Sequence, residues 1–197
     1  KRLLALTFSV NAAYKIKKDV SLQIPNLLED TGLNINVSDK VFVSNYHGFC
    51  RNILKKYGNK FHASLSTIDT LQSVEDSDPR KLMRSVKGLS SDDARLLSKF
   101  NDSVKKTDVP YLEQNINQYN EIVINHLLPQ EWIPYNAILT LTLKLFTDFP
   151  KILEFYQRYF TTILVDEYQD TNTLSYWLIE HLITDQSNVI LLGDSLQ

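Results

Sequence analysis

The sequence predicts an α/β fold whose parallel β-sheet is interrupted once by an all-helical segment. Short apolar runs alternate with amphipathic helical patterns at both ends of the chain, an order typical of parallel strands connected by helices. Residues 60–146 instead show short helical patterns between polar loops, without the alternation typical of strands. We therefore expect one domain from residues 1–59 and 147–197, and a helical insertion subdomain at residues 60–146.

The elements before the insertion are predicted from apolar periodicity. Their expected bounds are a strand at residues 3–8, a helix at 11–22, a strand at 41–43 and a helix at 47–57. The first helix carries Ala12, Ile16 and Val20 on one face, with lysines largely outside. Pro25 and Gly32 are expected to bracket the end of this helix and the loop that follows.

Helices dominate the insertion, and the alternation of strands and helices resumes after it. The helical patterns of the insertion lie near residues 80–86, 94–100, 111–127 and 135–146. Ser90 and the acidic residues after it suit the start of the second of these helices. The expected elements after the insertion are a helix from Pro150 to residue 160, a strand at 162–165, a helix at 173–182 and a strand at 189–192.

The composition is that of an ordinary soluble globular protein, with 43% hydrophobic and 22% charged residues among 197. Cys50 is the single cysteine, so no disulfide framework can form, and we expect a reducing compartment such as the cytoplasm. No apolar run approaches membrane-spanning length, and the apolar start is too short for a signal peptide.

Charge is distributed unevenly, although the net charge is only −2. Residues 1–60 hold ten Lys or Arg and four Asp or Glu, whereas residues 161–197 hold six Asp or Glu and no Lys or Arg. A basic first part can follow the phosphate backbone of a nucleic acid. Helix surfaces are also often basic, so charge alone leaves both interpretations open.

Two predicted strands end in polar residues that suit phosphate and metal chemistry. The apolar run at residues 162–165 is followed by Asp166 and Glu167, and the final apolar run is followed by Gly193 and Asp194. Carboxylates are costly to bury unless a cation or hydrogen-bond donors meet them, and a magnesium-bound nucleotide would do so. We expect one nucleotide site at the carboxyl edge of the parallel sheet.

The chain does not contain the glycine-rich loop that normally holds nucleotide phosphates. None of its five glycines begins the motif G-x-x-x-x-G-K-[ST], and residues 161–197 offer no cation of their own. An acidic segment needs a metal and a cationic partner to bind ATP. We therefore expect a piece of a longer protein, with the phosphate loop upstream, that is inactive as an ATPase by itself.

Four segments are similar, in the family's order, to motifs of the UvrD/Rep/PcrA-like DNA helicases of superfamily 1. Residues 4–13 are similar to motif Ia, residues 43–49 to motif Ib, residues 166–172 (Asp-Glu-Tyr-Gln-Asp-Thr-Asn) to the Walker B motif, also called motif II, and residues 193–197 to the start of motif III. The Asp-Glu-x-Gln-Asp string is the most specific of these. The resemblance implies a RecA-like ATPase domain, ATP and Mg²⁺ as cofactors, and DNA as the partner.

The resemblance also implies roles for single residues. The implied nucleotide-site residues are Asp166 as the Mg²⁺ ligand, Glu167 for water activation, Gln169 and Gln197 for sensing the γ-phosphate, and Asp170 for orienting the loop. The implied contacts with single-stranded DNA are Thr7, Phe8, Asn45, Tyr46 and His47. Plainer alternatives remain, because Phe8 can end a core strand, His47 can brace its loop and Asp170 can cap a turn.

The expected function is ATP-dependent movement on single-stranded DNA or at single/double-strand junctions, with 3′→5′ polarity implied by the family. Val10-Asn11 stands where the family usually has Asn-Lys, which removes a cation near the DNA. One alternative is the motor subunit of a recombination nuclease. The other is a degenerate module that binds DNA without motor activity, which the retained Asp166 and Glu167 argue against.

Overall fold

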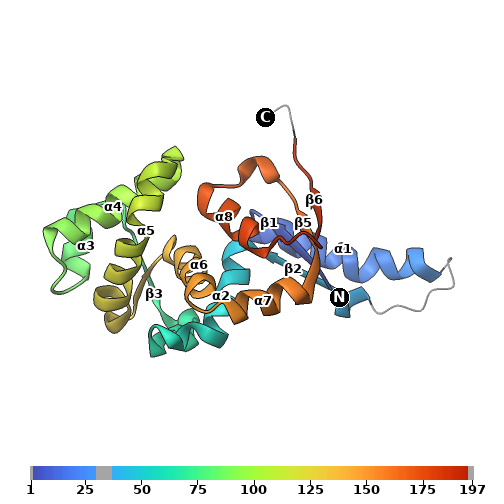
Figure 1. Cartoon of the computed structure of the whole chain (residues 1–197), viewed down its shortest axis with the longest axis horizontal. Coiled ribbons are helices and arrows are strands. Elements are labelled where there is room, and N and C mark those ends of the chain that lie inside the picture. Colours follow the sequence, from blue (N-terminus) through green and yellow to red (C-terminus); the bar gives the residue numbers. More distant parts are fainter. Residues whose placement is uncertain (1, 30–36, 195–197) are drawn as a thin grey trace. The chain divides into compact units, whose positions relative to one another are not determined.

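The computed structural model describes residues 2–29 and 37–194, in which β-strands pair only in parallel (Figure 1). The larger sheet has four strands in the order β2-β1-β5-β6. Its strands are β1 (Arg2–Thr7), β2 (Val41–Asn45), β5 (Phe160–Val165) and β6 (Asn188–Leu191). The predicted α/β class and its parallel sheet are confirmed.

Helices occur at each place where the periodicity predicts one. Their bounds are α1 (Val10–Glu29), α2 (Tyr46–Tyr57), α3 (Pro79–Ser85), α4 (Ser91–Lys106), α5 (Val109–Ile122), α6 (Ala137–Asp148), α7 (Pro150–Tyr159) and α8 (Thr173–Leu182). α5 continues into a π-helical turn at Val123–Leu127. Among the described residues, no helix is both long enough and apolar enough to cross a membrane.

The expectation that Pro25 marks the end of the first helix is wrong, because α1 continues to Glu29. A proline inside a helix lacks the N–H that would bond the carbonyl four residues earlier. That carbonyl belongs to Ser21, which is exposed, so water can bond it instead. Gly32, expected in the loop that follows, lies outside the described residues.

The chain divides into two compact units, called unit 1 and unit 2 below. Unit 1 consists of residues 1–49, 151–171 and 179–197, and unit 2 consists of residues 50–150 and 172–178. The four-stranded sheet, α1 and nearly all of α7 belong to unit 1. The helices α3 to α6 belong to unit 2.

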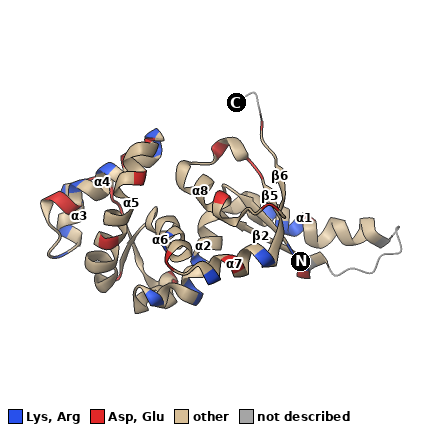
Figure 2. Ribbon diagram, in the orientation of Figure 1, with Lys and Arg blue, Asp and Glu red and all other residues tan. Residues whose placement is uncertain are grey.

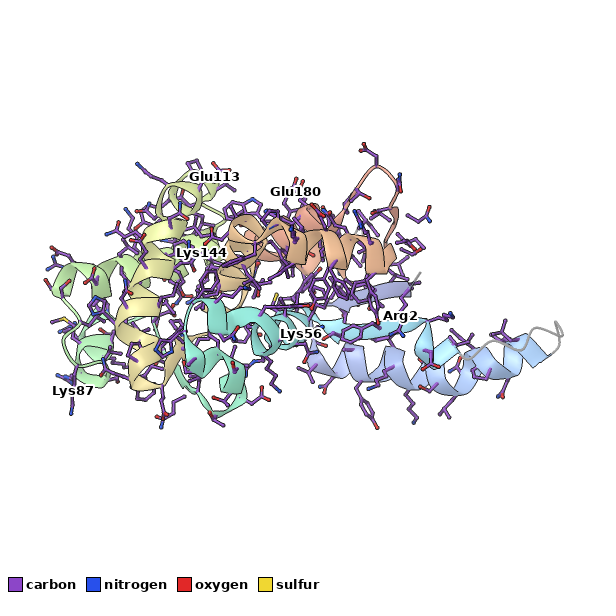
Figure 3. All side chains as sticks on the ribbon, turned by 60° about the horizontal axis from the view of Figure 1, so that its bottom comes forward. Arg2, Lys56, Lys87, Glu113, Lys144 and Glu180 are labelled. Carbon is purple, nitrogen blue, oxygen red and sulfur yellow. The ribbon has the colours of Figure 1, made fainter. Side chains whose placement is uncertain are left out.

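The core of unit 1 forms around its two central strands, which are apolar along most of their length. The buried residues of these strands include Leu4, Ala5 and Leu6 of β1 and Phe160, Ile163 and Val165 of β5. Central strands of a parallel sheet are covered on both faces, which explains the near-continuous apolar runs. At the start of β1, the guanidinium carbon of Arg2 (labelled in Figure 3) lies 4.8 Å from the centre of the Tyr159 ring.

Unit 2 is not all-helical, which corrects the prediction for residues 60–146. The strands β3 (Gln72–Val74) and β4 (Trp132–Pro134) form a small parallel sheet. Three residues are too few to produce a recognisable alternation, and the pairing joins segments far apart in sequence. Elsewhere in the unit, the rings of Phe100 and Tyr119 stack with their centres 4.1 Å apart. On α6, Lys144 (labelled in Figure 3) pairs with Asp148 at 2.9 Å.

Candidate nucleotide and DNA site

The carboxyl edge of the larger sheet brings together the residues that follow β1, β5 and β6. The backbone N–H of Asp166 donates to the Leu6 carbonyl at 2.8 Å. The backbone N–H of Leu192 donates to the Val165 carbonyl, also at 2.8 Å. These bonds continue the strand pairing by one residue beyond β5 and β6. Polar residues that are distant in sequence therefore meet at one edge, where open α/β sheets bind ligands.

Glu167 leaves the strand conformation directly after β5. Its backbone is left-handed, with φ 52° and ψ 48°, and it precedes the short helical turn Tyr168–Asp170. Successive side chains of a continuing strand would point to opposite faces, and this bend removes that constraint on Asp166 and Glu167. The Tyr168 N–H donates to the Leu192 carbonyl at 2.9 Å and holds the turn against the end of β6.

Gln169 connects the predicted water-activating carboxylate to the segment after β6. Its Nε2 donates to Oε2 of Glu167 at 2.6 Å. Its Oε1 accepts from the backbone N–H of Asp194 at 3.2 Å. Asp170 is exposed, and its backbone N–H donates to the Glu167 carbonyl at 3.0 Å. The predicted residues Glu167, Gln169 and Asp170 thus belong to one hydrogen-bonded turn, while Gln197 lies outside the described residues.

The two predicted DNA contacts in motif Ia differ in exposure. Phe8 is 54% exposed, so its ring is accessible to a base. Thr7 is 0% exposed, and its Oγ1 has no hydrogen-bond partner among the described residues. Leu6 pairs with Val165, so the next residues on these strands, Thr7 and Asp166, lie at the same level of the sheet. Thr7 is therefore placed beside the predicted metal ligand rather than on the surface.

The three predicted DNA contacts in motif Ib begin α2. Oδ1 of Asn45 accepts from the Gly48 N–H at 2.8 Å and so caps the helix. Tyr46 is only 2% exposed, its hydroxyl lies 3.2 Å from Oγ1 of Thr171, and burial raises its pKa. His47 is half-buried in the first turn. In this arrangement the Tyr46 ring is buried and is not open to a base.

The sequence signals for some of these contacts are weak. Thr171 lies inside the motif II string, but nothing in that string indicates a bond to Tyr46, which is 125 positions away. Nothing in the short apolar run before Thr7 predicts that its hydroxyl is buried without a partner. The position of Gly193 directly after a strand is the one local signal of a close approach.

The residues at this edge fit a magnesium ion that arrives with a nucleotide. Within residues 2–29 and 37–194, no group of three or more His, Cys, Asp or Glu could hold a metal by itself. Mg²⁺ is commonly bound by one or two carboxylates together with substrate phosphates and water. Asp166 can supply the carboxylate, and the unpartnered Thr7 hydroxyl adds a polar group at the same level.

The electrostatics of this edge require a cation from elsewhere. From β5 to the end of the described chain, charged residues other than His are all acidic, so the ribbon carries no Lys or Arg colour there (Figure 2). A cavity of about 530 Å³ in unit 1 is not part of this site. Its lining includes Thr161 near the start of β5 and Ser187 just before β6. It therefore lies at the amino ends of these strands, away from the carboxylates.

Comparison with known families gives a match over the whole chain. Residues 1–197 match the family described as the UvrD/REP helicase N-terminal domain. The segments that meet at the carboxyl edge of the sheet are thus parts of one matched sequence.

Several proteins named ATP-dependent DNA helicase PcrA are also similar to this chain. The Bacillus subtilis protein is 31% identical over 208 residues, which cover 99% of this chain and 26% of that protein. The Leuconostoc citreum protein is 27% identical, with coverage of 100% and 26%. The Staphylococcus aureus protein is 24% identical, with coverage of 99% and 27%. The chain thus spans about a quarter of the length of these relatives.

Proposed function

The chain belongs to the UvrD/REP helicase N-terminal domain family, and we propose that it is part of the motor of an ATP-dependent DNA helicase. The whole protein would couple hydrolysis of magnesium-bound ATP to 3′→5′ movement on single-stranded DNA. The observation that carries this proposal is the turn after β5, where Gln169 holds the carboxylate of Glu167, the residue that follows Asp166 in the chain. A structural turn alone does not require an oriented carboxylate at this edge.

We further propose that the four-stranded sheet is part of a RecA-like domain made of residues 1–59 and 147–197, with residues 60–146 as its insertion. The parallel order β2-β1-β5-β6 supports this assignment. β6 supports a sheet that continues further, because it is an edge strand and its apolar residues, with the one that follows it, are 37–48% exposed: Val189, Ile190, Leu191 and then Leu192. A strand leading into a phosphate-binding loop could pair there.

Asp166 and Glu167 have distinct roles in this proposal. Mg²⁺, when bound, supplies charge neutralisation at the phosphates. The Asp166 carboxylate holds the ion at the edge of the sheet, directly or through water. Glu167 is exposed, and Gln169 occupies its Oε2, which leaves Oε1 to accept a proton from the attacking water.

DNA would contact the loop after β1 and the start of α2. The exposed Phe8 ring can stack on a base, an interaction worth about 1–3 kcal/mol per base in single-strand grooves. Asn45 can donate through its amide nitrogen while its Oδ1 caps α2. His47 is the further candidate from the same turn, and single-stranded DNA or a single/double-strand junction is the proposed substrate.

The proposal is tested by Glu167→Gln in the full-length protein. Glutamine has the same shape but cannot accept the proton, so DNA-stimulated ATP turnover should fall about 10²–10⁴-fold. Binding of a fluorescent ATP analogue should remain largely intact. Glu180→Gln, an exposed position on α8 (labelled in Figure 3), is the matched control and should turn over ATP normally. Normal turnover by Glu167→Gln would contradict the assignment.

A non-motor DNA-binding module is the alternative that specific observations favour. Motif Ia lacks the usual Asn-Lys at Val10-Asn11, and the Tyr46 ring is buried. Both features depart from the DNA contacts expected of a motor in this family, as a degenerate relative would. An ATPase assay of the full-length protein with and without single-stranded DNA separates the two functions, because a binding module would show no DNA-stimulated turnover.

A further inference from the structure

We infer that Gln169 is a positioning residue. It links the Glu167 carboxylate to the segment after β6 (residues 193–194), so the orientation of the carboxylate depends on the position of that segment. The inference rests on the proposed function, because it assigns Glu167 to water activation. It differs from the family resemblance, which implies that Gln169 senses the γ-phosphate directly.

Both ends of the Gln169 carboxamide are engaged, and each bond demands the same amide orientation. Nε2 can only donate, and it faces the Glu167 carboxylate at 2.6 Å. Oε1 can only accept, and it faces the Asp194 N–H at 3.2 Å. A hydrogen bond to an ionised acceptor is roughly twice as strong as a neutral one. The carboxamide is therefore a fixed bridge between the catalytic carboxylate and the backbone after β6.

The glycine at position 193 permits this bridge. A Cβ atom at Gly193 would lie 2.8 Å from Oε1 of Gln169, which is closer than such contacts allow. The other nearest atoms, at 3.6 Å, belong to the Gln169 backbone and to the Tyr168 side chain and would be in ordinary contact. An added methyl group at this position would therefore displace the carboxamide and leave the rest of the turn in place.

Glu167 depends on this bridge for its orientation. Its side chain is exposed, so packing does not fix it, and among the described side chains Gln169 is the one that hydrogen-bonds its carboxylate. The segment at residues 193–194 also begins motif III, whose Gln197 is predicted to meet the γ-phosphate. A shift of this segment would move the Gln169 carboxamide, which is bonded directly to Oε2 of Glu167. The geometry thus couples the state of motif III to the activation of water.

The test compares three variants of the full-length protein. Gln169→Met keeps the length of the side chain but removes the amide, and Gly193→Ala keeps the amide but displaces it. The third variant combines the two substitutions. Each single variant should lower kcat for ATP hydrolysis with saturating single-stranded DNA by about tenfold or more, since small misplacements of catalytic groups are costly. KM for ATP should change little. The kcat of the double variant should be no lower than that of the less active single variant, because both changes remove the same contact.

A matched glutamine controls for loss of an amide in general. Gln157 of α7 donates to the His181 carbonyl at 2.7 Å within unit 1, and Gln157→Met should leave kcat unchanged. Additive effects of Gln169→Met and Gly193→Ala, or a rise in KM with kcat unchanged, would overturn the inference. Glu167→Gln, measured in parallel, separates the two claims. If it abolishes turnover while Gln169→Met does not lower kcat, only the positioning role fails; if it turns over ATP normally, the proposed function fails.

Discussion

Asp76 is a carboxyl group buried in unit 2, where ionisation is unfavourable. It is 6% exposed, and its Oδ2 accepts from the Tyr119 hydroxyl at 3.5 Å. Burial raises the pKa of Asp76 from its usual 3.8 to about 6, although its backbone N–H and Tyr119 act in the opposite direction. The folded protein therefore binds this proton more tightly than the unfolded chain does.

The stability of unit 2 should fall as pH rises through the range in which Asp76 ionises. Because the pKa is higher in the folded state, the stabilisation is fully present below about pH 4 and is lost as pH rises through about pH 6. This rise in the pKa of Asp76 corresponds to roughly 3 kcal/mol in the free energy of unfolding. Asp76→Asn should remove this dependence and raise the free energy of unfolding at neutral pH.

Urea unfolding at several pH values checks this prediction. Both tryptophans of the chain, Trp132 and Trp177, lie in unit 2, so their fluorescence reports on its unfolding. Glu113→Gln makes the same chemical change at an exposed site of α5 and should leave the pH dependence as it is. An Asp76→Asn protein with the wild-type pH dependence would show that this carboxyl group is not the source.

At the level of elements, the start of α2 combines a structural role and a predicted binding role in one side chain. Oδ1 of Asn45 caps the helix through the Gly48 N–H, and the proposed DNA contact uses the amide nitrogen. An aspartate keeps the capping oxygen but loses the donor and adds negative charge. The two roles can therefore be separated by substitution.

Asn45→Ala should lower both stability and DNA affinity, whereas Asn45→Asp should lower DNA affinity alone. Loss of the cap costs about 1 kcal/mol. A carboxylate facing a phosphate should weaken single-stranded DNA binding about tenfold or more, because a donor is replaced by a like charge. Thermal unfolding and fluorescence anisotropy measure the two effects. Asn188→Asp, an exposed position at the start of β6, is the charge-matched control. Unchanged DNA binding by Asn45→Asp would show that Asn45 only caps the helix and does not contact DNA.

The sequence predicts local elements well and contacts between distant segments poorly. α8 has the predicted bounds because its apolar spacing is regular. The pairing of β3 with β4 and the Tyr46–Thr171 bond depend on the approach of segments far apart in sequence. The motif strings predict Gln169 as a site residue and place Gly193 at the start of motif III. Their contact follows only from the adjacency of β5 and β6 in the sheet.

Across the whole molecule, the proposed nucleotide site has carboxylates suited to a metal ion and to water, but the segment that supplies them has no cation to meet the phosphates. Asp166 and Glu167 lie at the carboxyl edge, and residues 161–197 carry six acidic residues and no Lys or Arg. The glycine-rich phosphate motif is not among the 197 residues. The exposed apolar edge of β6 is where the sheet could continue toward such a loop.

The 197-residue chain should therefore bind magnesium nucleotide only weakly, with a Kd above about 1 mM, which corresponds to roughly −4 kcal/mol. The acidic edge repels the phosphates unless a metal and an external cation are both present. Titration with a fluorescent ATP analogue and Mg²⁺ measures this affinity, and a longer protein that includes the phosphate loop should bind far more tightly. Asp166→Asn in that longer protein should weaken the Mg²⁺-dependent part of binding. Micromolar binding by the 197-residue chain itself would instead mean that these residues hold the phosphates without the loop.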